Sequence, residues 1–447
     1  MYTRFASGVL FPVHEWLKGH HSAALRKELE RTQWLGPGEI ERLQLARLKQ
    51  FLVEAGASVP YYRRLFERSG FDPRGLSCVE DLGRIPFLTK RLIRENTQEL
   101  RSERARRLVR FSTGGSTGEP LVFYLGRDRV SHDVAAKWRA TRWWGVDIGD
   151  REIVLWGSPI ELGAQDRVRA LRDRMLRSRL LPAFEMSPGQ MSEYLQVIRS
   201  FKPRMLFGYA SALARLARHA RSTGVSLGDV GVRAAFTTGE TLYPDQRRII
   251  EEVFGAPVAN GYGSRDAGFI AHECPSQALH LSAEHLIVEL VNEDGARVAP
   301  GVTGEVVVTH FGTSEFPFIR YRTGDMAVLD PRTCACGRGL PVLQTVHGRS
   351  TDFIRTAAGG AMHALALIYE VRDRADVQAF KFVQGEDFSL ELQLVAGPEL
   401  TPQAEQEILD RLRRRLGEET RVRITRVEEI RPERSGKHRY VVSHAAR

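Results

Sequence analysis

The fold is decided by residues 205–239, which read MLFGYASALARLARHARSTGVSLGDVGVRAAFTTG. The apolar run Met205-Leu206-Phe207 ends at Gly208 and predicts a short buried strand. A helix is expected over about 211–222, and residues 232–236 predict a second strand that ends at Thr237-Thr238-Gly239. This order is typical of a largely parallel α/β sheet, in which ligands bind at the carboxyl ends of the strands.

The segments on either side extend this pattern. Residues 153–156 (IVLW) predict another strand, and residues 38–56 predict an amphipathic helix after the Gly36-Pro37-Gly38 breaker. From 285 to 330 the pattern changes to β, with strands expected at 285–291, 304–311 and 326–329.

After about residue 350 the chain predicts a small α+β unit. A helix near 363–373 is followed by strands at 379–383 and 389–395, a basic helix at 403–416 and a last strand at 421–427. The expected fold class is therefore α/β. We expect a large N-terminal body of several subdomains with mixed and parallel sheets (1–348) and a small α+β C-terminal lid domain (349–447).

The composition limits the class of protein. The 447 residues are 42% hydrophobic and 27% charged, which indicates a globular chain and argues against a disordered or fibrous one. No run of about eighteen apolar residues occurs, so no membrane-spanning helix is expected. The first 21 residues hold a short apolar stretch, but His14, Glu15 and Lys18 interrupt it and no small-residue cleavage site follows. We therefore expect a mature cytoplasmic protein.

The charge balance is basic, with 65 Lys and Arg against 55 Asp and Glu, or a formal net charge of +10. Arginine-rich stretches lie at 101–110, 167–179 and 411–415. Solvated helix faces explain them better than nucleic acid, because no recognised nucleic-acid motif accompanies them. An anionic substrate such as a nucleotide would suit the same sign of charge.

A loop rich in small residues is the first candidate for chemistry. Ser112-Thr113-Gly114-Gly115-Ser116-Thr117-Gly118 is followed by Glu119-Pro120, and the strand expected at 121–125 comes next. Glycines let the backbone approach an anion, while N–H groups and hydroxyls donate to phosphate oxygens. The GxxxxGK[ST] pattern of a Walker A loop is absent. A flexible linker is the alternative, but the position between a helical segment and a strand suits a phosphate-binding loop better.

Five motifs in order resemble the adenylate-forming superfamily, which contains the acyl-CoA synthetases and AMP-ligases. TGGSTGEP at 113–120 resembles its phosphate loop, and YGSRD at 262–266 resembles its adenine and magnesium motif. YRTGD at 321–325 matches a third motif residue for residue. GRSTDFI at 348–354 resembles the segment that opens the C-terminal domain, and Ser435-Gly436-Lys437 resembles the terminal motif with a mobile lysine.

The resemblance narrows to a branch of the superfamily. The HEC sequence at 272–274 and the CACGR sequence at 334–338 resemble phenylacetate-CoA ligases. The stretches at 12–15, 59–63 and 88–90 resemble relatives associated with capsule and exopolysaccharide genes.

The resemblance implies a set of nucleotide-binding residues. Tyr262 would stack on adenine with Gly239 and Glu240 across the pocket, and Asp325 would accept hydrogen bonds from the ribose hydroxyls. The complete set expected to bind ATP is Thr113, Gly114, Gly115, Ser116, Thr117, Gly118, Gly239, Glu240, Tyr262, Gly263, Ser264 and Asp325.

Three residues are expected to be catalytic. Asp266 would bind the Mg²⁺ that bridges the ATP phosphates, because a hard carboxylate oxygen suits that ion. Arg349 would contact ribose or phosphate, and Lys437 would neutralise charge that develops at the α-phosphate as a carboxylate attacks it.

Three of the four cysteines and one histidine form a second candidate group, in which five residues separate Cys274 from His280 and 53 residues separate His280 from Cys334. Cys274, His280, Cys334 and Cys336 offer three thiolates and one imidazole, a set that suits structural Zn²⁺. Spacing alone leaves a group of unrelated reduced cysteines as the alternative, and His272 and His285 are rival ligands. In relatives of the phenylacetate-CoA ligase type these residues bind zinc, so the resemblance favours a closed site that fastens the ATP pocket's walls together. So few cysteines also fit a reducing compartment.

Four residues depart from the family pattern. Arg265 replaces the usual Thr or Ser, and Asp266 replaces the usual Glu. These changes alter how far the side chains extend toward a bound metal ion. Glu119 stands where phenylacetate ligases often have Lys, and Thr351 stands where many relatives carry a hinge Asp. The last departure bears on lid rotation and therefore on the identity of the second substrate.

Together these features predict an AMP-forming acid–thiol ligase that uses ATP, Mg²⁺, CoA and structural Zn²⁺. A carboxylate would attack the α-phosphorus of ATP, and CoA would then displace AMP. Trp156, Phe207, Tyr209 and Ala210 would favour an aromatic or arylalkyl acid, although they equally suit a core. An amine acceptor is one alternative, and a non-catalytic nucleotide-binding protein of polysaccharide assembly is another. The expected partners are the acid and the nucleotide, with a homodimer as an option and no nucleic acid.

Overall fold

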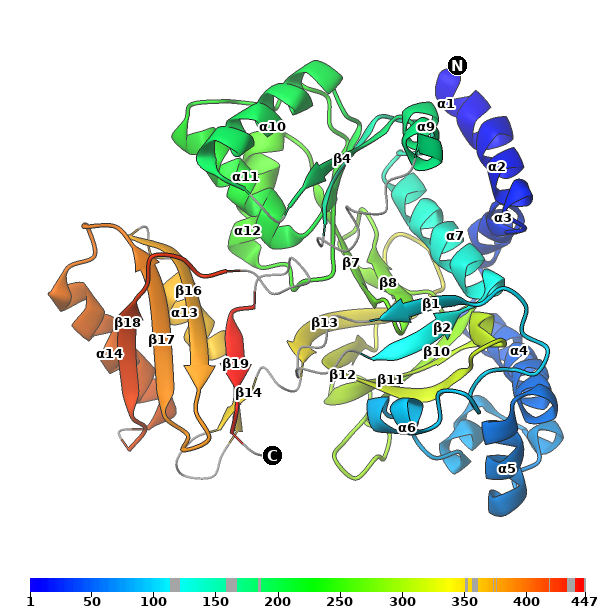
Figure 1. Cartoon of the computed structure of the whole chain (residues 1–447). Helices are drawn as coiled ribbons and strands as arrows, with labels where there is room; N and C mark the ends of the chain where they lie inside the picture. Colours follow the sequence, from blue (N-terminus) through cyan, green and yellow to red (C-terminus); the bar gives the residue numbers. More distant parts are fainter. Residues whose placement is uncertain are drawn as a thin grey trace. The chain divides into compact units, whose positions relative to one another are not determined.

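The structure is a computed structural model, and it describes residues 1–112, 121–157, 167–183, 186–349, 353–355, 361–372, 374, 376–417, 419–431 and 439–445. The chain forms two compact units, Met1–His347 and Gly348–Arg447 (Figure 1). Among the described residues, no helix combines the length and the apolar content that a bilayer crossing requires.

The first unit is built on a mixed sheet whose described strands run in the order β10-β11-β12-β13-β9-β8-β7-β6-β5-β3-β4. Its parallel part consists of β3 (Glu152–Trp156), β4 (Ser178–Pro182), β5 (Met205–Gly208), β6 (Ala234–Thr238) and β7 (Val258–Ser264). The helices α10 (Pro188–Phe201), α11 (Ala210–Ser222) and α12 (Pro244–Phe254) lie beside these strands (Figure 1). The parallel α/β sheet predicted from residues 205–239 is thus confirmed.

In the rest of the sheet, from β8 to β10 in the sheet order, strands pair in antiparallel fashion: β7 with β8, β8 with β9, β9 with β13, β12 with β11 and β11 with β10. It contains β8 (Gly268–Glu273), β9 (Leu279–Leu281), β10 (Leu286–Val291), β11 (Thr303–His310), β12 (Phe318–Asp330) and β13 (Val342–Arg349). The turn between β7 and β8 reverses the chain direction. The strands β7 and β12 are not neighbours in the sheet, but side chains of β7 and of the turn after it reach side chains of β12.

Helices precede and cover this sheet. Residues 2–17 form one continuous helix, made of α1 (Tyr2–Phe5), a π-helical turn (Ala6–Leu10) and α2 (Phe11–Leu17). It is followed by α3 (Ser22–Thr32), α4 (Pro37–Ser58), α5 (Pro60–Ser69) and α6 (Lys90–Glu95), with short 3₁₀ turns at Pro73–Gly75, Val79–Arg84 and Phe311–Thr313. The hairpin β1 (Val109–Ser112) and β2 (Val122–Leu125) precedes α7 (Arg127–Trp143), and α9 (Arg167–Leu176) precedes β4.

The second unit has a four-stranded sheet in the order β18-β17-β16-β19. Its elements are β14 (Phe353–Arg355), β15 (Ala361–His363), α13 (Leu365–Arg372), β16 (Val377–Gln384), β17 (Leu390–Ala396), α14 (Pro402–Leu416), β18 (Val422–Arg426) and β19 (Val441–Ser443). Leu390, Leu392 and Leu394 alternate on one buried face of β17, as strand periodicity requires. The small α+β unit predicted after residue 350 is confirmed, with β14, β15 and β19 as additional strands.

Candidate functional site

Two of the expected nucleotide-binding residues meet directly. Tyr262 lies on β7 and Asp325 on β12, and the Tyr262 hydroxyl donates to Asp325 Oδ2 at 2.9 Å. Burial, together with the adjacent Asp325 carboxylate, raises the pKa of Tyr262 well above its usual value, so this hydroxyl keeps its proton. Two motifs that are distant in the sequence therefore share one hydrogen bond.

A second contact joins the same two motifs. Asp266 follows β7 and is 6% exposed, and its Oδ2 accepts from the hydroxyl of Tyr321 on β12. Its Oδ1 accepts from the Ser264 hydroxyl and from the Ala267 backbone N–H. Burial alone would raise the pKa of Asp266, but these hydroxyl donors, with the charge of Lys90, lower it overall. Asp266 is thus an ionised carboxylate held in one orientation.

Arg129 on α7 supports the turn that carries Asp266. Its side chain is fully buried, and its two terminal amino groups donate to the backbone carbonyls of Asp266 at 3.1 Å and Arg265 at 3.3 Å. Its Nε faces both carboxylate oxygens of Asp133 at 3.1 and 3.0 Å. The sequence motifs do not include Arg129, and they include Tyr321 without a role for it. Spacing of Arg129 and Asp133 by four residues was the available indication, but many exposed helix pairs share it.

Gly239 and Glu240 follow β6, the strand next to β7. Gly239 has a φ of +80°, which lets the chain turn at the carboxyl end of the strand. Glu240 accepts a hydrogen bond from the backbone N–H of Ser211 at the start of α11, at 3.0 Å. Gly263 lies so close to the Gly268 carbonyl that a Cβ there would approach it to 2.2 Å. These residues therefore shape the backbone around Tyr262.

Several expected site residues lie outside the described part of the chain. Thr113, Gly114, Gly115, Ser116, Thr117 and Gly118 of the phosphate loop are among them, as are Lys437, Glu119 and Thr351. Arg349 ends β13, and its side chain is not described. The roles expected for all of these residues stay predictions.

The residues expected to line an acid pocket pack on one another. The rings of Trp156 and Tyr209 stack at 4.1 Å between centroids, and Phe207 lies 5.9 Å from Trp156. Tyr209 and Ala210 are almost completely buried, whereas Trp156 is half-buried. This packing is that of a core layer, with Trp156 as the member that keeps contact with solvent.

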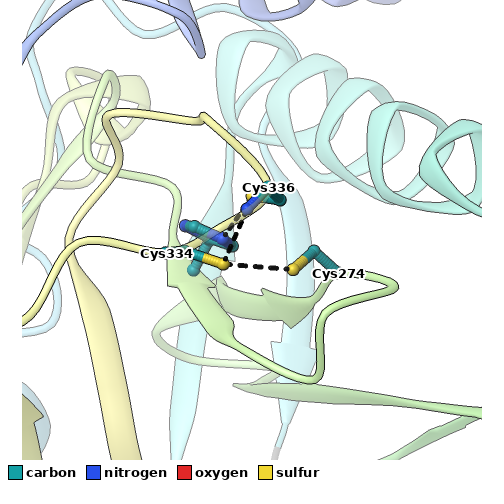
Figure 2. Close-up of side chains that lie close together, drawn as sticks. Cys274, Cys334 and Cys336 are labelled. Carbon is teal, nitrogen blue, oxygen red and sulfur yellow. Dashed lines mark hydrogen bonds between the residues drawn. The ribbon is translucent and has the colours of Figure 1, made fainter.

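The four residues expected to bind zinc converge. Cys274 follows β8, His280 lies on β9, and Cys334 and Cys336 lie between β12 and β13. Their ligand atoms all lie within 4.8 Å of one another, and Figure 2 shows the three cysteine side chains turned toward a common point. The Sγ atoms of Cys274 and Cys334 are 3.7 Å apart, which matches the roughly 3.8 Å between two thiolates bound tetrahedrally at about 2.3 Å.

The histidine has the tautomer that a metal requires. His280 Nδ1 lies 3.1 Å from the Leu340 carbonyl oxygen, which fixes the proton on Nδ1 and leaves Nε2 to face Cys336 Sγ at 3.2 Å. Burial lowers the pKa of His280 to about 4, so the ring is neutral. The donor set therefore fits Zn²⁺.

The rival ligands lie elsewhere. His272 is buried between the rings of Phe269 and Phe236, and burial lowers its pKa to about 3. His285 packs against His132, with 5.1 Å between ring centroids. Neither histidine belongs to the group formed by the three cysteines and His280.

His132, Asp133 and His310 form a second close group among the described residues. His310 Nδ1 accepts from the Gly312 backbone N–H at 3.1 Å, so its neutral ring carries the proton on Nε2 and offers no lone pair there. The Asp133 carboxylate is already paired with Arg129. This group therefore suits a metal ion less well than the cluster of three cysteines and His280 does.

The comparisons with known proteins agree with this arrangement. Residues 111–315 match the family of AMP-binding enzymes, and residues 354–444 match the CapK C-terminal domain. Protein CapK of Staphylococcus aureus is 24% identical over 78% of this chain and 76% of its own length. The phenylacetate-coenzyme A ligase of Thermus thermophilus is 28% identical over 71% of this chain and 72% of its own length.

The fold has a close match among solved structures. A crystal structure of 2-hydroxyisobutyryl-CoA ligase in the postadenylation state superposes with a TM-score of 0.75 at 22% identity, covering 92% of this chain and 91% of that one. The resemblance inferred from the five motifs is thereby confirmed. The chain belongs to the AMP-binding superfamily of adenylate-forming enzymes, carries a CapK C-terminal domain, and is a distant relative of CapK and the phenylacetate-coenzyme A ligases.

Proposed function

We propose that this protein activates a carboxylic acid with ATP and transfers the acyl group to CoA, releasing pyrophosphate and AMP. The observation that carries the proposal is the pairing of the YGSRD and YRTGD motifs through Tyr262–Asp325 and Tyr321–Asp266. Membership of the AMP-binding superfamily and the names of the phenylacetate-coenzyme A ligase relatives support it.

Tyr262 and Asp325 are the proposed nucleoside contacts. A Tyr ring offers a flat face to adenine, and an ionised carboxylate accepts strongly from a ribose diol. The hydroxyl of Tyr262 fixes the Asp325 carboxylate before the nucleotide arrives. A carboxylate held in advance loses less entropy on binding than a mobile one.

Asp266 is proposed as the residue that faces Mg²⁺ and the phosphates. A carboxylate offers about four acceptor positions, and Ser264, Ala267 and Tyr321 donate to its two oxygens. About one acceptor position on the Asp266 carboxylate is left, so Asp266 would supply at most one direct bond to the ion. When bound, Mg²⁺ would neutralise phosphate charge, while Asp266 would keep Ser264 and Tyr321 in place.

The proposed first step joins the acid to AMP. A carboxylate oxygen of the acid attacks the α-phosphorus of ATP, the bond to the β-phosphate oxygen breaks, and pyrophosphate leaves. Lys437 is proposed to offset the negative charge that develops on the α-phosphate oxygens, and Arg349 is proposed to contact ribose or phosphate. Loss of such a contact typically costs about 3 kcal/mol of barrier, or roughly a hundredfold in rate.

The proposed second step releases AMP. The CoA sulfur attacks the acyl carbon of the mixed anhydride, and the carbon–oxygen bond to AMP breaks. Aromatic and arylalkyl acids are the leading substrates, because the relatives are named for phenylacetate and Trp156 keeps a solvent-facing edge beside Tyr209.

The cysteine cluster is proposed as a structural Zn²⁺ site. Four protein ligands would close the coordination sphere, which leaves no position for substrate. The ion would tie the segment after β8 to the loop between β12 and β13. Since Asp266 lies just before β8 and Asp325 lies on β12, the ion would also hold the two parts of the proposed site together.

The test is carboxylate-dependent exchange of labelled pyrophosphate into ATP with purified protein and a panel of aromatic, arylalkyl and short aliphatic acids. Exchange with at least one acid, lost in Asp325→Ala but kept in Asp330→Ala at the last residue of β12, would support adenylation. Absence of exchange with every acid, in a protein that still binds ATP, would overturn it. Addition of CoA or of amines to the active pair would then identify the acceptor by its product.

A further inference from the structure

The helix formed by residues 2–17 turns an apolar stripe to solvent. Phe5, Val9, Val13, Trp16 and Leu17 recur at spacings of three and four residues and are 50%, 48%, 51%, 74% and 72% exposed. This spacing places them on one side of a helix. Side chains of this size usually lie in a core, so a continuous exposed row indicates a contact surface.

The inner side of the same helix is anchored. The Thr3 hydroxyl donates to Asp150 Oδ1 at 2.9 Å, and Ala6 packs so close to Gly149 that a Cβ at position 149 would lie 2.4 Å from the Ala6 Cβ. Farther along, the buried Glu15 accepts from the Ser22 hydroxyl. The outward direction of the stripe is therefore fixed by contacts.

The helix α9 continues this surface. The Tyr2 hydroxyl donates to the Met175 carbonyl at 2.5 Å, and the Arg177 guanidinium lies 4.2 Å from the Tyr2 ring centroid. Leu171 and Met175, one helical turn apart on α9, are 58% and 40% exposed. Figure 1 shows α9 close to the start of the chain. We call the stripe with Leu171 and Met175 the apolar face.

This concentration is specific to the two elements. Among the described residues, 13 large apolar side chains are exposed. Nine of them lie on these helices or, for Met1, directly before the first: Met1, Tyr2, Phe5, Val9, Val13, Trp16, Leu17, Leu171 and Met175. The other four are scattered over other elements. Single exposed apolar residues need no explanation, but such a cluster does.

Cations border the apolar face. Arg4 and Lys18 stand exposed at the two ends of the helix, and Arg174 stands exposed between Leu171 and Met175. The acids of residues 1–18 and 167–177 are Glu15 and Asp173. Glu15 is 4% exposed, and Asp173 is paired with Arg172 at 2.5 Å. The border of the face is therefore positive.

We propose that the apolar face docks the protein on an anionic lipid bilayer. An amphipathic helix that lies in the interface inserts aromatic and aliphatic side chains among the acyl chains while its cations meet anionic headgroups. A second copy of the chain fits less well. Two-fold pairing through this face would bring like charges together in either orientation: Arg4 toward Lys18 if the helices ran antiparallel, and each cation toward its own copy if they ran parallel.

The test is flotation of the full-length protein with vesicles of equal parts phosphatidylglycerol and phosphatidylcholine, compared with phosphatidylcholine alone. Trp16→Ser combined with Leu17→Ser should reduce the vesicle-bound fraction at least about tenfold, because two highly exposed apolar side chains lose their insertion. Lys18→Gln and Arg174→Gln should each weaken binding about fivefold at low salt. Val302→Ser and Phe388→Ser, which change exposed apolar residues elsewhere, should bind like the unchanged protein.

Sedimentation velocity and far-ultraviolet circular dichroism accompany the flotation. Loss of binding in the double variant with unchanged folding supports the proposal. Equal binding by the double variant, or no preference for phosphatidylglycerol, overturns it. A concentration-dependent dimer that the double variant abolishes, without vesicle binding, overturns it in favour of self-association. Because none of these measurements uses catalysis, they are independent of the ligase proposal.

Discussion

Tyr262 and Asp325 lie 63 residues apart in the chain, yet they share a hydrogen bond inside the first unit. Tyr262→Phe keeps the aromatic face and removes the donor to an ionised carboxylate. Hydrogen bonds to charged groups contribute about 1.5–3 kcal/mol. We therefore expect ATP affinity to fall roughly tenfold or more, measured by isothermal titration calorimetry.

A second tyrosine provides the control for this loss. Tyr61→Phe removes a hydroxyl from α5, an element that contributes no residue to the proposed site, and should leave ATP affinity unchanged. Equal affinity in Tyr262→Phe and the unchanged protein would mean that the Asp325 carboxylate needs no help from Tyr262.

Arg129 and Asp133 form a charge pair whose arginine has no contact with solvent. Asp133→Asn leaves the Arg129 guanidinium buried with a neutral partner, and breaking a buried pair typically costs about 3–5 kcal/mol. Urea unfolding should report this loss of stability. The pair Arg91–Glu95 has the same spacing but is exposed, so Glu95→Gln should cost less than about 0.5 kcal/mol.

The same pair should depend on pH in one direction. Burial would raise the pKa of Asp133, but the charge of Arg129 outweighs it and lowers the pKa. A carboxylate with a lowered pKa stabilises the folded state above its unfolded pKa of about 4 and loses that contribution as the pH falls further. The stability gap between the unchanged protein and Asp133→Asn should therefore narrow below about pH 4. A gap that stays constant down to pH 2 would show that the charge of Asp133 is not its cause.

At the scale of elements, the sequence predicted what local patterns encode. The strands β3 and β5 and the helix α11 appeared within one or two residues of their expected bounds, because short apolar runs that end in glycine leave few alternatives. The strand β6 begins two residues later than expected. By contrast, β12 is much longer than 326–329, since its first half carries the polar site residues Tyr321–Asp325 and lacks an apolar run.

The helix α7 shows why other elements escaped prediction. Its buried face includes Arg129, His132 and Arg139, so the usual apolar periodicity is absent. Arg139 donates to Glu284 at 2.5 Å, a partner 145 residues away that no local pattern indicates. The helix of residues 2–17 escaped for the opposite reason, because its apolar residues face outward.

The sequence predicted the candidate site as a set of motifs, but only the structure shows which side chains of these motifs form hydrogen bonds with one another. Tyr262, Asp325 and Asp266 were given roles from the sequence. Tyr321, which holds Asp266, was noted only as part of the YRTGD motif, and Arg129, which holds the turn, was not noted. Their partners depend on how β7, β12 and α7 pack.

The cysteine cluster joins elements that are otherwise separate in sequence, so metal removal should act at that scale. A strong chelator should release about one zinc per chain and lower the melting temperature, since a closed site contributes folding energy directly. Cys336→Ser should purify with less zinc and show the same lower melting temperature without chelator. Metal analysis and calorimetry measure both effects.

Cys78→Ser is the matched control for this prediction, because Cys78 is a free cysteine outside the cluster. It should keep the zinc content and the melting temperature of the unchanged protein. A metal-free protein that melts at the same temperature as the purified one would rule out a structural ion at the cluster.

At the scale of the whole molecule, the chain consists of two compact units, and each has its own apolar core. Leu392 is fully buried at the centre of the second unit's sheet, where it pairs with Phe382 on β16 and Ile424 on β18. Leu392→Ala should destabilise this unit by about 2–5 kcal/mol, because it removes buried methyl groups and leaves a cavity. Hydrogen exchange followed by peptide mass spectrometry should then show faster exchange in residues 376–417, while peptides from β5, β6 and α11 keep the rates of the unchanged protein. Phe388→Ala, which trims an exposed side chain in the β16–β17 turn, should leave exchange in both units unchanged. Equal acceleration in both units after Leu392→Ala would mean that they unfold as one cooperative body, and the division at His347 would then describe packing without independent stability.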